Sequence, residues 1–202
     1  MNMWDERYSQ HESVYGLEPN DFLAEHTGRI PRGRVLCLAE GEGRNALHLA
    51  RAGYEVLAVD LSRVGLEKAA RRAEQAGVKI RTQLADLADF EIEPAHWQGI
   101  VSIWAHVPRD IRRTLHRKVV AGLAPGGVLI LEAYTPRQLE LGGKGGPGPD
   151  QLDRFMSLAA LRDELSGLKL EFAQETEREV NEGEFHRGRG AVVQVVAVKE
   201  AA

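Results

Sequence analysis

The most constraining feature of the sequence is an apolar run that stops at a glycine turn and continues with helical spacing. Residues 34–38 read Arg-Val-Leu-Cys-Leu, and Gly41-Glu42-Gly43 follow shortly after them. In residues 44–52 the apolar side chains return every three to four positions, and Gly53 ends the pattern. A strand, a glycine turn and a helix in this order begin the βαβ unit of a parallel sheet.

The same alternation continues along the chain. Six further strands are predicted at 54–59, 78–84, 99–104, 128–134, 168–175 and 191–199. Helices are predicted at 62–76, 108–122 and 157–165, with a tight turn at 123–127. The sequence therefore predicts an α/β fold of the Rossmann type, with a mostly parallel sheet, helices on both faces and a closing antiparallel hairpin.

Length and composition limit the domain organisation of the chain and the kinds of partner it can have. A chain of 202 residues with 43% hydrophobic residues fits one domain over 1–202, with a core at 34–202 and a helical arm or lid at 1–33 that carries Trp4, Tyr8 and Tyr15. The net charge of -4 disfavours nucleic acid as a partner. No stretch is apolar enough for a membrane helix, and Cys37 has no second cysteine to pair with. We therefore expect a soluble, cytoplasmic protein of undetermined oligomeric state.

Ligands of open parallel sheets bind outside the carboxyl ends of the strands, so the residues that follow each strand are the site candidates. Glycines at 41 and 43 allow a ligand to approach the backbone closely, and Asp60 at the end of the second strand can accept both hydroxyls of a ribose. Asp86, His106 and Tyr134 follow the third, fourth and fifth strands. This pattern predicts an adenosine-containing ligand.

These residues resemble the class I S-adenosylmethionine-dependent methyltransferases, and within them the small tellurite-resistance-type and thiopurine-type branches. The likeness spans nearly the whole chain and is carried by residues 35–45, 53–60, 85–90 and 123–127. It implies about seven strands with the last one antiparallel, S-adenosylmethionine as cofactor and a small-molecule methyl acceptor. The cofactor-binding residues that it implies are Ala39, Glu40, Gly41, Gly43, Asn45, Asp60, Leu61, Asp86, Leu87 and Trp104, with no metal ligands.

The chain departs from the family pattern at two positions. An acid usually stands where this chain has Cys37, and a glycine usually stands where it has Ala39. The resemblance suggests that Glu40 supplies the missing carboxylate and binds the ammonium group of the methionine moiety. The alternative is that Glu40 is an ordinary solvated residue of the turn.

The acceptor end of the site is predicted from the last strand and from the loop after the fifth strand. An antiparallel final strand begins at the edge where the parallel strands end, which predicts that residues 182–189 lie near the ligand. The tellurite-resistance-type branch is similar here, with a His-Arg pair entering the last strand, and this resemblance implies that His186 and Arg187 are catalytic or substrate-contact residues. The alternative is a surface hairpin with incidental charge. His106 is a further candidate, with a helix-capping or packing role as its alternative. The glycine- and proline-rich segment 142–149 is predicted to be a mobile loop that covers the substrate, or only a linker.

Two other functional classes fit parts of the sequence. The run Gly41-Glu42-Gly43-Arg44-Asn45-Ala46 also matches the G-x-G-x-x-A fingerprint of NAD(P)-dependent oxidoreductases. Acidic Glu40 and Glu42 would lie beside the pyrophosphate in that case, which argues against it. A non-catalytic module that binds an adenosine ligand is the third possibility.

Overall fold

The computed structural model describes residues 2–201, and its strands form one seven-stranded sheet in the order β3-β2-β1-β4-β5-β7-β6. The strands are β1 (Arg34–Leu38), β2 (Glu55–Asp60), β3 (Ile80–Leu84), β4 (Trp97–Ile103), β5 (Leu123–Tyr134), β6 (Lys169–Asn181) and β7 (Arg187–Val198). The helices are α1 (Met3–Gln10), α2 (Asp21–His26), α3 (Arg44–Arg51), α4 (Arg63–Gln75), α5 (Arg109–Gly122), α6 (Gln138–Leu141) and α7 (Leu158–Glu164), with short 3₁₀ turns η1 (Thr27–Arg29) and η2 (Leu152–Arg154).

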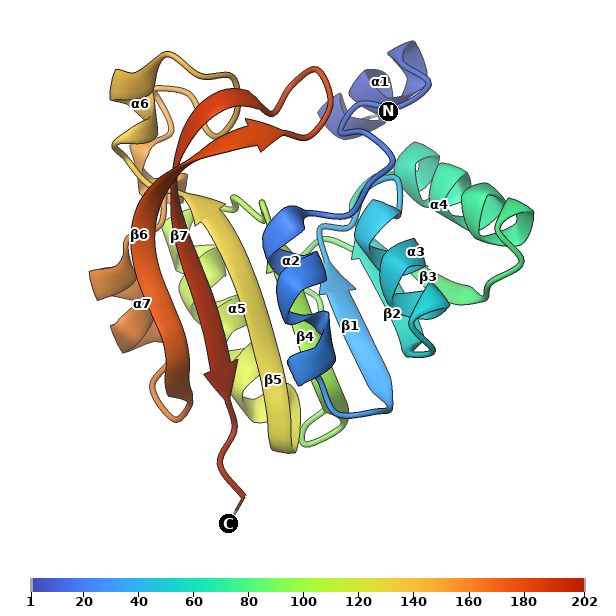
Figure 1. Cartoon of the computed structure of the whole chain (residues 1–202), viewed down its shortest axis with the longest axis vertical. Helices are drawn as coiled ribbons and strands as arrows, with labels where there is room; N and C mark the ends of the chain where they lie inside the picture. Colours follow the sequence, from blue (N-terminus) through green and yellow to red (C-terminus); the bar gives the residue numbers. More distant parts are fainter. Residues whose placement is uncertain (1, 202) are drawn as a thin grey trace.

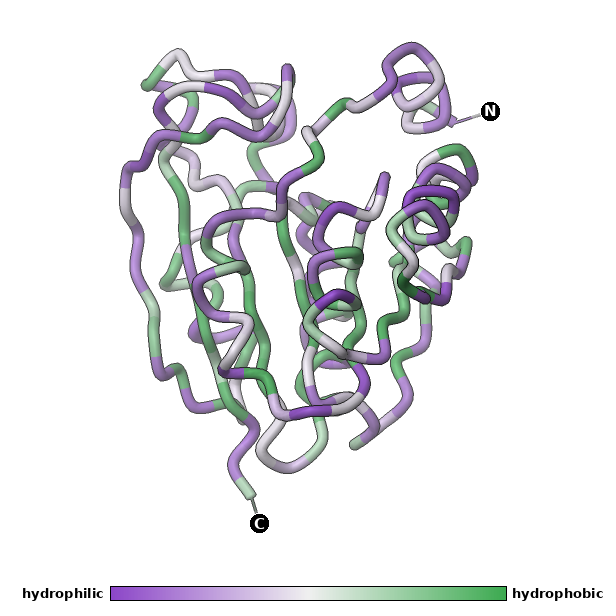
Figure 2. Tube along the Cα trace, turned by 45° about the vertical axis from the view of Figure 1, so that its right-hand side comes forward, coloured by the Kyte–Doolittle hydropathy of each residue, from purple (hydrophilic) through white to green (hydrophobic). Residues whose placement is uncertain are grey.

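Both faces of the sheet are covered by helices. Figure 1 shows α2 and α3 in front of the central strands and α5 behind them. Alternation along β1 explains this arrangement, because Val35 and Cys37 pack into the core beneath α2 and α3 while Leu36 and Leu38 pack into the core beneath α5 and α7. The hydrophobic colouring of Figure 2 is accordingly concentrated along the central strands.

The strand directions confirm the predicted fold class. β1, β2, β3, β4 and β5 pair in parallel, whereas β7 lies antiparallel between β5 and β6. Tyr134 at the end of β5 pairs with Val192 near the beginning of β7, so the segment that enters β7 does lie at the carboxyl edge of the parallel strands.

The boundaries differ from the sequence prediction in three places. β5 begins at Leu123, which pairs with Trp97, so the residues predicted as a tight turn belong to an irregular first part of the strand. β6 extends to Asn181 and β7 begins at Arg187, because a long two-stranded ribbon extends the hairpin beyond the sheet. The short elements α6 and η2 were not predicted, since segments of four and three residues are too brief to show a periodic pattern.

The segment before β1 has two parts. Helix α1 packs on α4, and its Asp5 carboxylate accepts a hydrogen bond from the Ser62 hydroxyl at 2.7 Å. In contrast, Phe22, Leu23 and Ile30 belong to the buried core. Only the residues before α2 therefore lie across the ligand edge as an arm, and the rest of 2–33 is part of the core. Within residues 2–201, none of the helices is long and apolar enough to span a bilayer.

Candidate active site

The candidate cofactor residues follow neighbouring strands at one edge of the sheet. Ala39 and the glycine turn follow β1, Asp60 ends β2, Asp86 follows β3 and Trp104 follows β4. Because β3, β2, β1 and β4 are adjacent in this order, the fold brings these loops side by side. This edge is where open α/β sheets bind their ligands.

The glycine turn after β1 needs both of its glycines. Gly41 and Gly43 have φ values of 60° and 86°, in the left-handed region that glycine adopts without strain. A Cβ atom at Gly43 would come within 2.6 Å of the Ala69 Cβ atom, so this turn can pack against α4 only with glycine. Ala39 also has a positive φ of 51°, which explains why a glycine is usual at this position in the resembling family.

Asp60 is held at the end of β2 by backbone amides. Its two carboxylate oxygens accept hydrogen bonds from Gly41 N at 2.8 Å and Ser62 N at 2.7 Å. The side chain is buried, and burial raises the pKa of the Asp60 carboxyl while these amide bonds partly offset the rise. A carboxylate oxygen can accept more than one hydrogen bond, so Asp60 keeps the capacity to bind ribose hydroxyls.

Glu40 points into the beginning of α3. Its carboxylate accepts a hydrogen bond from Ala46 N at 2.7 Å, which supplies the helix cap that Gly43 lacks. Burial raises the pKa of Glu40 to about 7. The carboxylate also lies close enough to Cys37 to raise the pKa of that buried thiol, after the larger effect of burial itself. The acid of Glu40 therefore lies beside the position from which the family acid is missing.

The other implied cofactor residues divide into free and engaged side chains. Asp86 is exposed and its carboxylate accepts only from Ala88 N, at 2.9 Å, whereas Leu87 is part of the core. Leu61 is exposed, and its carbonyl accepts from Asn2 Nδ2 at 3.0 Å. Asn45 accepts a hydrogen bond from Asn20 N at 2.9 Å, so its side chain fixes the polypeptide that leads into α2.

The arm lies directly on the glycine turn. The Tyr8 ring is buried, and its hydroxyl oxygen lies 2.4 Å from the point where a Cβ atom of Gly41 would stand. Glu42 accepts a hydrogen bond from Val14 N at 2.8 Å and forms an ion pair with Lys68 at 3.0 Å. The arm therefore covers the turn on which the resemblance places the methionine end of the cofactor.

An aromatic cluster lies next to the cofactor edge, beyond β4 and β5. Trp104 stacks on Tyr134 with ring centroids 4.4 Å apart, and the His186 ring meets Trp104, Tyr134 and Tyr15 at 5.1, 5.4 and 4.7 Å. Tyr134 Oη and His186 Nδ1 are buried without a hydrogen-bond partner among residues 2–201. Buried polar atoms of this kind are usually satisfied, so these two mark a place where a ligand can bind.

Comparison with known proteins agrees with this geometry. Residues 35–127, which contain the glycine turn, Asp60, Asp86 and Trp104, match the family model described as a methyltransferase domain. The tRNA 5-carboxymethoxyuridine methyltransferase of Escherichia coli (strain K12) is 32% identical over 114 residues, which are 52% of this chain and 42% of that protein. The malonyl-[acyl-carrier protein] O-methyltransferase of Enterobacter lignolyticus (strain SCF1) is 30% identical over 176 residues, which are 84% of this chain and 66% of that protein.

The chain belongs to the class I S-adenosylmethionine-dependent methyltransferases. Two solved structures share the fold. TehB from Haemophilus influenzae has a TM-score of 0.71 and 19% identity, and the match covers 88% of this chain and 61% of TehB. A structure described under the conversion of a disulfide bond into a thioacetal group during echinomycin biosynthesis has a TM-score of 0.77 and 22% identity, and the match covers 98% of this chain and 91% of that chain. The E. coli methyltransferase is more than twice as long as the segment it shares, since this chain spans 42% of its length. Membership in this family removes the NAD(P)-dependent oxidoreductase from consideration.

The cofactor of this methyltransferase family is S-adenosylmethionine, and the residues of the edge fit it. The left-handed turn at Gly41 and Gly43 gives a ligand access to the backbone, and Asp60 stands where ribose hydroxyls are bound in sheets of this type. Glu40 offers a carboxylate for an ammonium group.

His106 has a structural position in this methyltransferase. Its Nδ1 lies 3.1 Å from the carbonyl of Arg154, and its Nε2 accepts a hydrogen bond from Tyr134 N at 3.2 Å. Burial lowers the pKa of His106 to about 4. Because both ring nitrogens are engaged, the geometry favours the packing role over the catalytic role.

Arg187 lies at the outer side of the candidate acceptor region. Its side chain is exposed, and its backbone pairs with Lys144 of the 142–149 segment as an antiparallel bridge. The neighbouring Arg189 forms an ion pair with Glu177 at 2.8 Å. The glycine-rich segment is thus attached to the beginning of β7, which places it beside His186.

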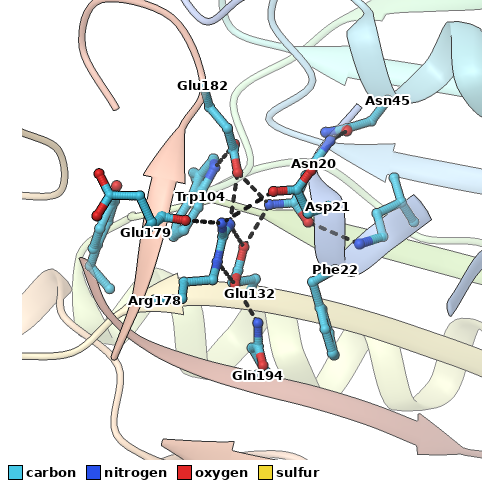
Figure 3. A network of polar contacts seen from close by, with 12 residues as sticks. Asn20, Asp21, Phe22, Asn45, Trp104, Glu132, Arg178, Glu179, Glu182 and Gln194 are labelled. Carbon is cyan, nitrogen blue, oxygen red and sulfur yellow. Dashed lines mark hydrogen bonds and ion pairs between the residues drawn. The ribbon is translucent and has the colours of Figure 1, made fainter. Parts of the chain in front are cut away.

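A buried polar network behind the aromatic cluster was not predicted from the sequence. It joins side chains of α3, β5, β6 and β7 with residues that precede α2 or directly follow β4 and β6, and Figure 3 shows most of its members around Arg178. Its members are Asn20, Arg44, Trp104, Glu132, Arg178, Glu182 and Gln194. The one sequence signal was Glu132, a charged residue within the apolar run of β5.

A separate cleft lies away from these residues. It has a volume of about 270 Å³, is formed between α5 and α7 and is lined by Arg109, Arg113 and Phe155, among others. The Arg112 and Glu164 side chains form an ion pair in its wall at 2.8 Å. This cleft contains none of the residues that the sequence predicted for cofactor or acceptor.

Proposed function

We propose that this chain transfers a methyl group from S-adenosylmethionine to a small, uncharged acceptor that binds against the ring cluster of Trp104, Tyr134 and His186. The observation that carries this proposal is the pair of buried polar atoms, Tyr134 Oη and His186 Nδ1, that lack a partner within residues 2–201 although they lie among aromatic rings. Aromatic faces bind a flat or apolar acceptor, and the two polar atoms can orient it.

The uncharged nature of the acceptor follows from the charges around the cluster. The nearest buried carboxylate, Glu182, is neutralised by Arg44 and Arg178. Burial lowers the pKa of His186 to about 3, so its ring is neutral at physiological pH. The exposed Arg187 lies outside the cluster. An anionic acceptor such as a metalloid oxyanion would thus lose its hydration without gaining a buried counter-charge.

The bound cofactor would supply an electrophilic methyl group on a positively charged sulfur. The chain's own contribution is to hold both ligands in position, because a displacement of this kind depends mainly on proximity and alignment. Asp60 and the glycine turn would bind the cofactor, while Trp104 and Tyr134 exclude water from the acceptor. A histidine with a pKa of about 3 is a poor base near pH 7, so the acceptor atom has to carry a free lone pair before transfer.

The relatives act on different acceptors, which makes the acceptor the part of the proposal that needs testing. By their names, one methylates tRNA and another methylates malonyl-[acyl-carrier protein]. The net charge of -4 disfavours a polyanion such as tRNA. The unpaired and buried Cys37 thiol is compatible with a reducing compartment, and we include a cytoplasmic location in the proposal.

Transfer of a labelled methyl group to a panel of acceptors tests the proposal. The panel contains uncharged aromatic amines, aromatic thiols that ionise near neutral pH, oxyanions, tRNA and an acyl-carrier protein. We expect transfer to an uncharged member, with kcat/KM lowered about tenfold in Tyr134→Phe, the scale of one buried hydrogen bond. Affinity for S-adenosylhomocysteine should be unchanged in this variant. Transfer only to oxyanions, tRNA or protein, or full activity of Tyr134→Phe, would refute the proposal.

A further inference from the structure

The buried network contains two glutamates whose surroundings are nearly matched. Each carboxylate accepts four hydrogen bonds, and both share Asn20 and Arg178 as donors. The remaining donor to Glu132 is Gln194 Nε2 at 2.7 Å. The remaining donors to Glu182 are Trp104 Nε1 at 2.6 Å and the Arg44 guanidinium. The two acids therefore share Asn20 and Arg178, but only Glu182 also accepts from residues of the candidate active site.

The backbone of Glu182 also belongs to the acceptor side of the site. Its N–H donates to the carbonyl of His186 at 2.8 Å, which closes the turn between β6 and β7 that presents the His186 ring. The next turn residue, Glu184, donates its N–H to the carbonyl of Val14 in the arm at 3.3 Å. This turn therefore contacts the arm directly beside Tyr15.

The partners of Glu182 stand on each side of the predicted ligands. Arg44 is the first residue of α3 and directly follows Gly43 of the cofactor turn. Trp104 has a positive φ of 58°, so its backbone is strained and needs support from its surroundings. The indole N–H has Glu182 as its acceptor, and the ring is stacked on Tyr134. Figure 3 shows the Glu182 carboxylate directed at both Trp104 and Arg178.

We propose that Glu182 is a positioning residue that fixes the Trp104 indole in the acceptor site and connects it through Arg44 to the cofactor turn. The role in the acceptor site rests on the proposed function, whereas the contacts of Glu182 with Trp104 and Arg44 do not depend on which acceptor binds. A carboxylate is needed because all four partners are donors. One carboxylate oxygen accepts from Asn20 and Arg178, and the other accepts from Trp104 and Arg44. A glutamine could turn its oxygen to Trp104 and keep that contact, so the indole is released only by a side chain without an acceptor, such as methionine.

The test compares Glu182→Met with Glu132→Met in a variant that keeps Trp104 as its single tryptophan, with Trp4→Phe and Trp97→Phe. Both methionine variants remove one buried carboxylate beside Arg178, so both should lower the Tm. Only Glu182→Met should free the indole, with at least a threefold rise in the acrylamide quenching constant of Trp104. It should also weaken binding of S-adenosylhomocysteine about five- to tenfold, whereas Glu132→Met should stay within twofold of the parent.

The outcomes separate a positioning role from a purely structural one. Equal quenching and equal affinity in the two variants would overturn the proposal, as would unchanged quenching in Glu182→Met. If Glu182→Met does not fold, Glu182→Asp takes its place, because it keeps the charge and withdraws it from Trp104 by one methylene, and the same criteria apply. If the parent does not bind S-adenosylhomocysteine, the proposed function fails, while the quenching comparison still decides the role of Glu182.

Discussion

Cofactor affinity should depend on pH through Glu40. Burial raises the pKa of this carboxyl to about 7, so the free protein holds it partly protonated at neutral pH. If the ionised carboxylate binds the ammonium group of the cofactor, binding lowers this pKa, and affinity rises with pH until Glu40 is fully ionised in the free protein. With a pKa of about 7, the ionised fraction is about 3% at pH 5.5 and about 76% at pH 7.5. Affinity should therefore fall about 25-fold, or about 2 kcal/mol, between pH 7.5 and 5.5.

Calorimetric titration with S-adenosylhomocysteine at half-unit pH steps measures this dependence, because this ligand keeps the methionine end and cannot react. In Glu40→Gln the pH dependence should disappear, with affinity at pH 7.5 reduced to about the value of the parent at pH 5.5. Glu42→Gln is the matched control, since Glu42 lies in the same turn but is already paired with Lys68 and should leave the pH dependence in place. A parent protein whose affinity is constant over this range would refute the assignment of Glu40 and return it to a helix-capping role.

Three further predictions concern the rest of the site. Asp60→Ala should weaken S-adenosylhomocysteine binding by about 1–3 kcal/mol in calorimetry, the scale for lost buried hydrogen bonds, and an unchanged affinity in the folded variant would remove Asp60 from the cofactor site. Because the pKa of His186 is lowered to about 3, the pH–rate profiles of the wild type and of His186→Asn should have the same shape between pH 6 and 9. If the substitution removes an ionisation from the profile, the histidine acts as a base and the prediction is wrong. Hydrogen exchange in residues 3–18 should slow when S-adenosylhomocysteine binds, because the arm lies on the glycine turn, and equal exchange with and without ligand would make the arm purely structural.

Acid stability provides a fourth prediction, from the two deeply paired carboxylates. Ion pairs and hydrogen bonds hold the pKa of Glu182 and of Glu164 at about 2, although burial opposes this shift. A depressed pKa stabilises the fold above the unfolded value near 4.5, and this stabilisation is lost as the pH falls from about 4.5 to 2. For Glu182 the loss should amount to about 3 kcal/mol. Urea unfolding of wild type and Glu182→Gln should therefore show a stability gap at pH 6 that narrows by pH 3, and a constant gap would contradict this reasoning.

Most of the fold could be predicted because its signals are local. The apolar strands, the glycine turn and the caps of α3 and α4 each depend on a few neighbouring residues, and the parallel order follows from the alternation of strands and helices. The exceptions depend on distant partners. β6 and β7 extend as a polar ribbon because they pair with each other, and Leu123 joins β5 because Trp97 lies opposite it.

The residues of the candidate site also divide into those that local sequence predicts and those that depend on distant partners. The placement of Gly41, Gly43 and Asp60 at one edge of the sheet could be predicted, since position after a strand determines where a residue lies. The acceptor side could be predicted only in part, because His186 acquires its neighbours through pairing across the sheet. Glu182 could not be distinguished from the other acids of a polar stretch, since its partners lie 78 residues away at Trp104 and 138 residues away at Arg44. The effect of burial on His186 could not be predicted either, since its lowered pKa of about 3 follows from neighbours that lie far away in the sequence.

A crystal structure of the complex with S-adenosylhomocysteine tests the central claim most directly. We predict that the ribose hydroxyls bind Asp60, that the methionine end lies on the turn at Gly41 and Gly43, and that the sulfur atom faces the cluster of Trp104, Tyr134 and His186. A ligand bound elsewhere, or one whose sulfur points away from these three rings, would contradict the account.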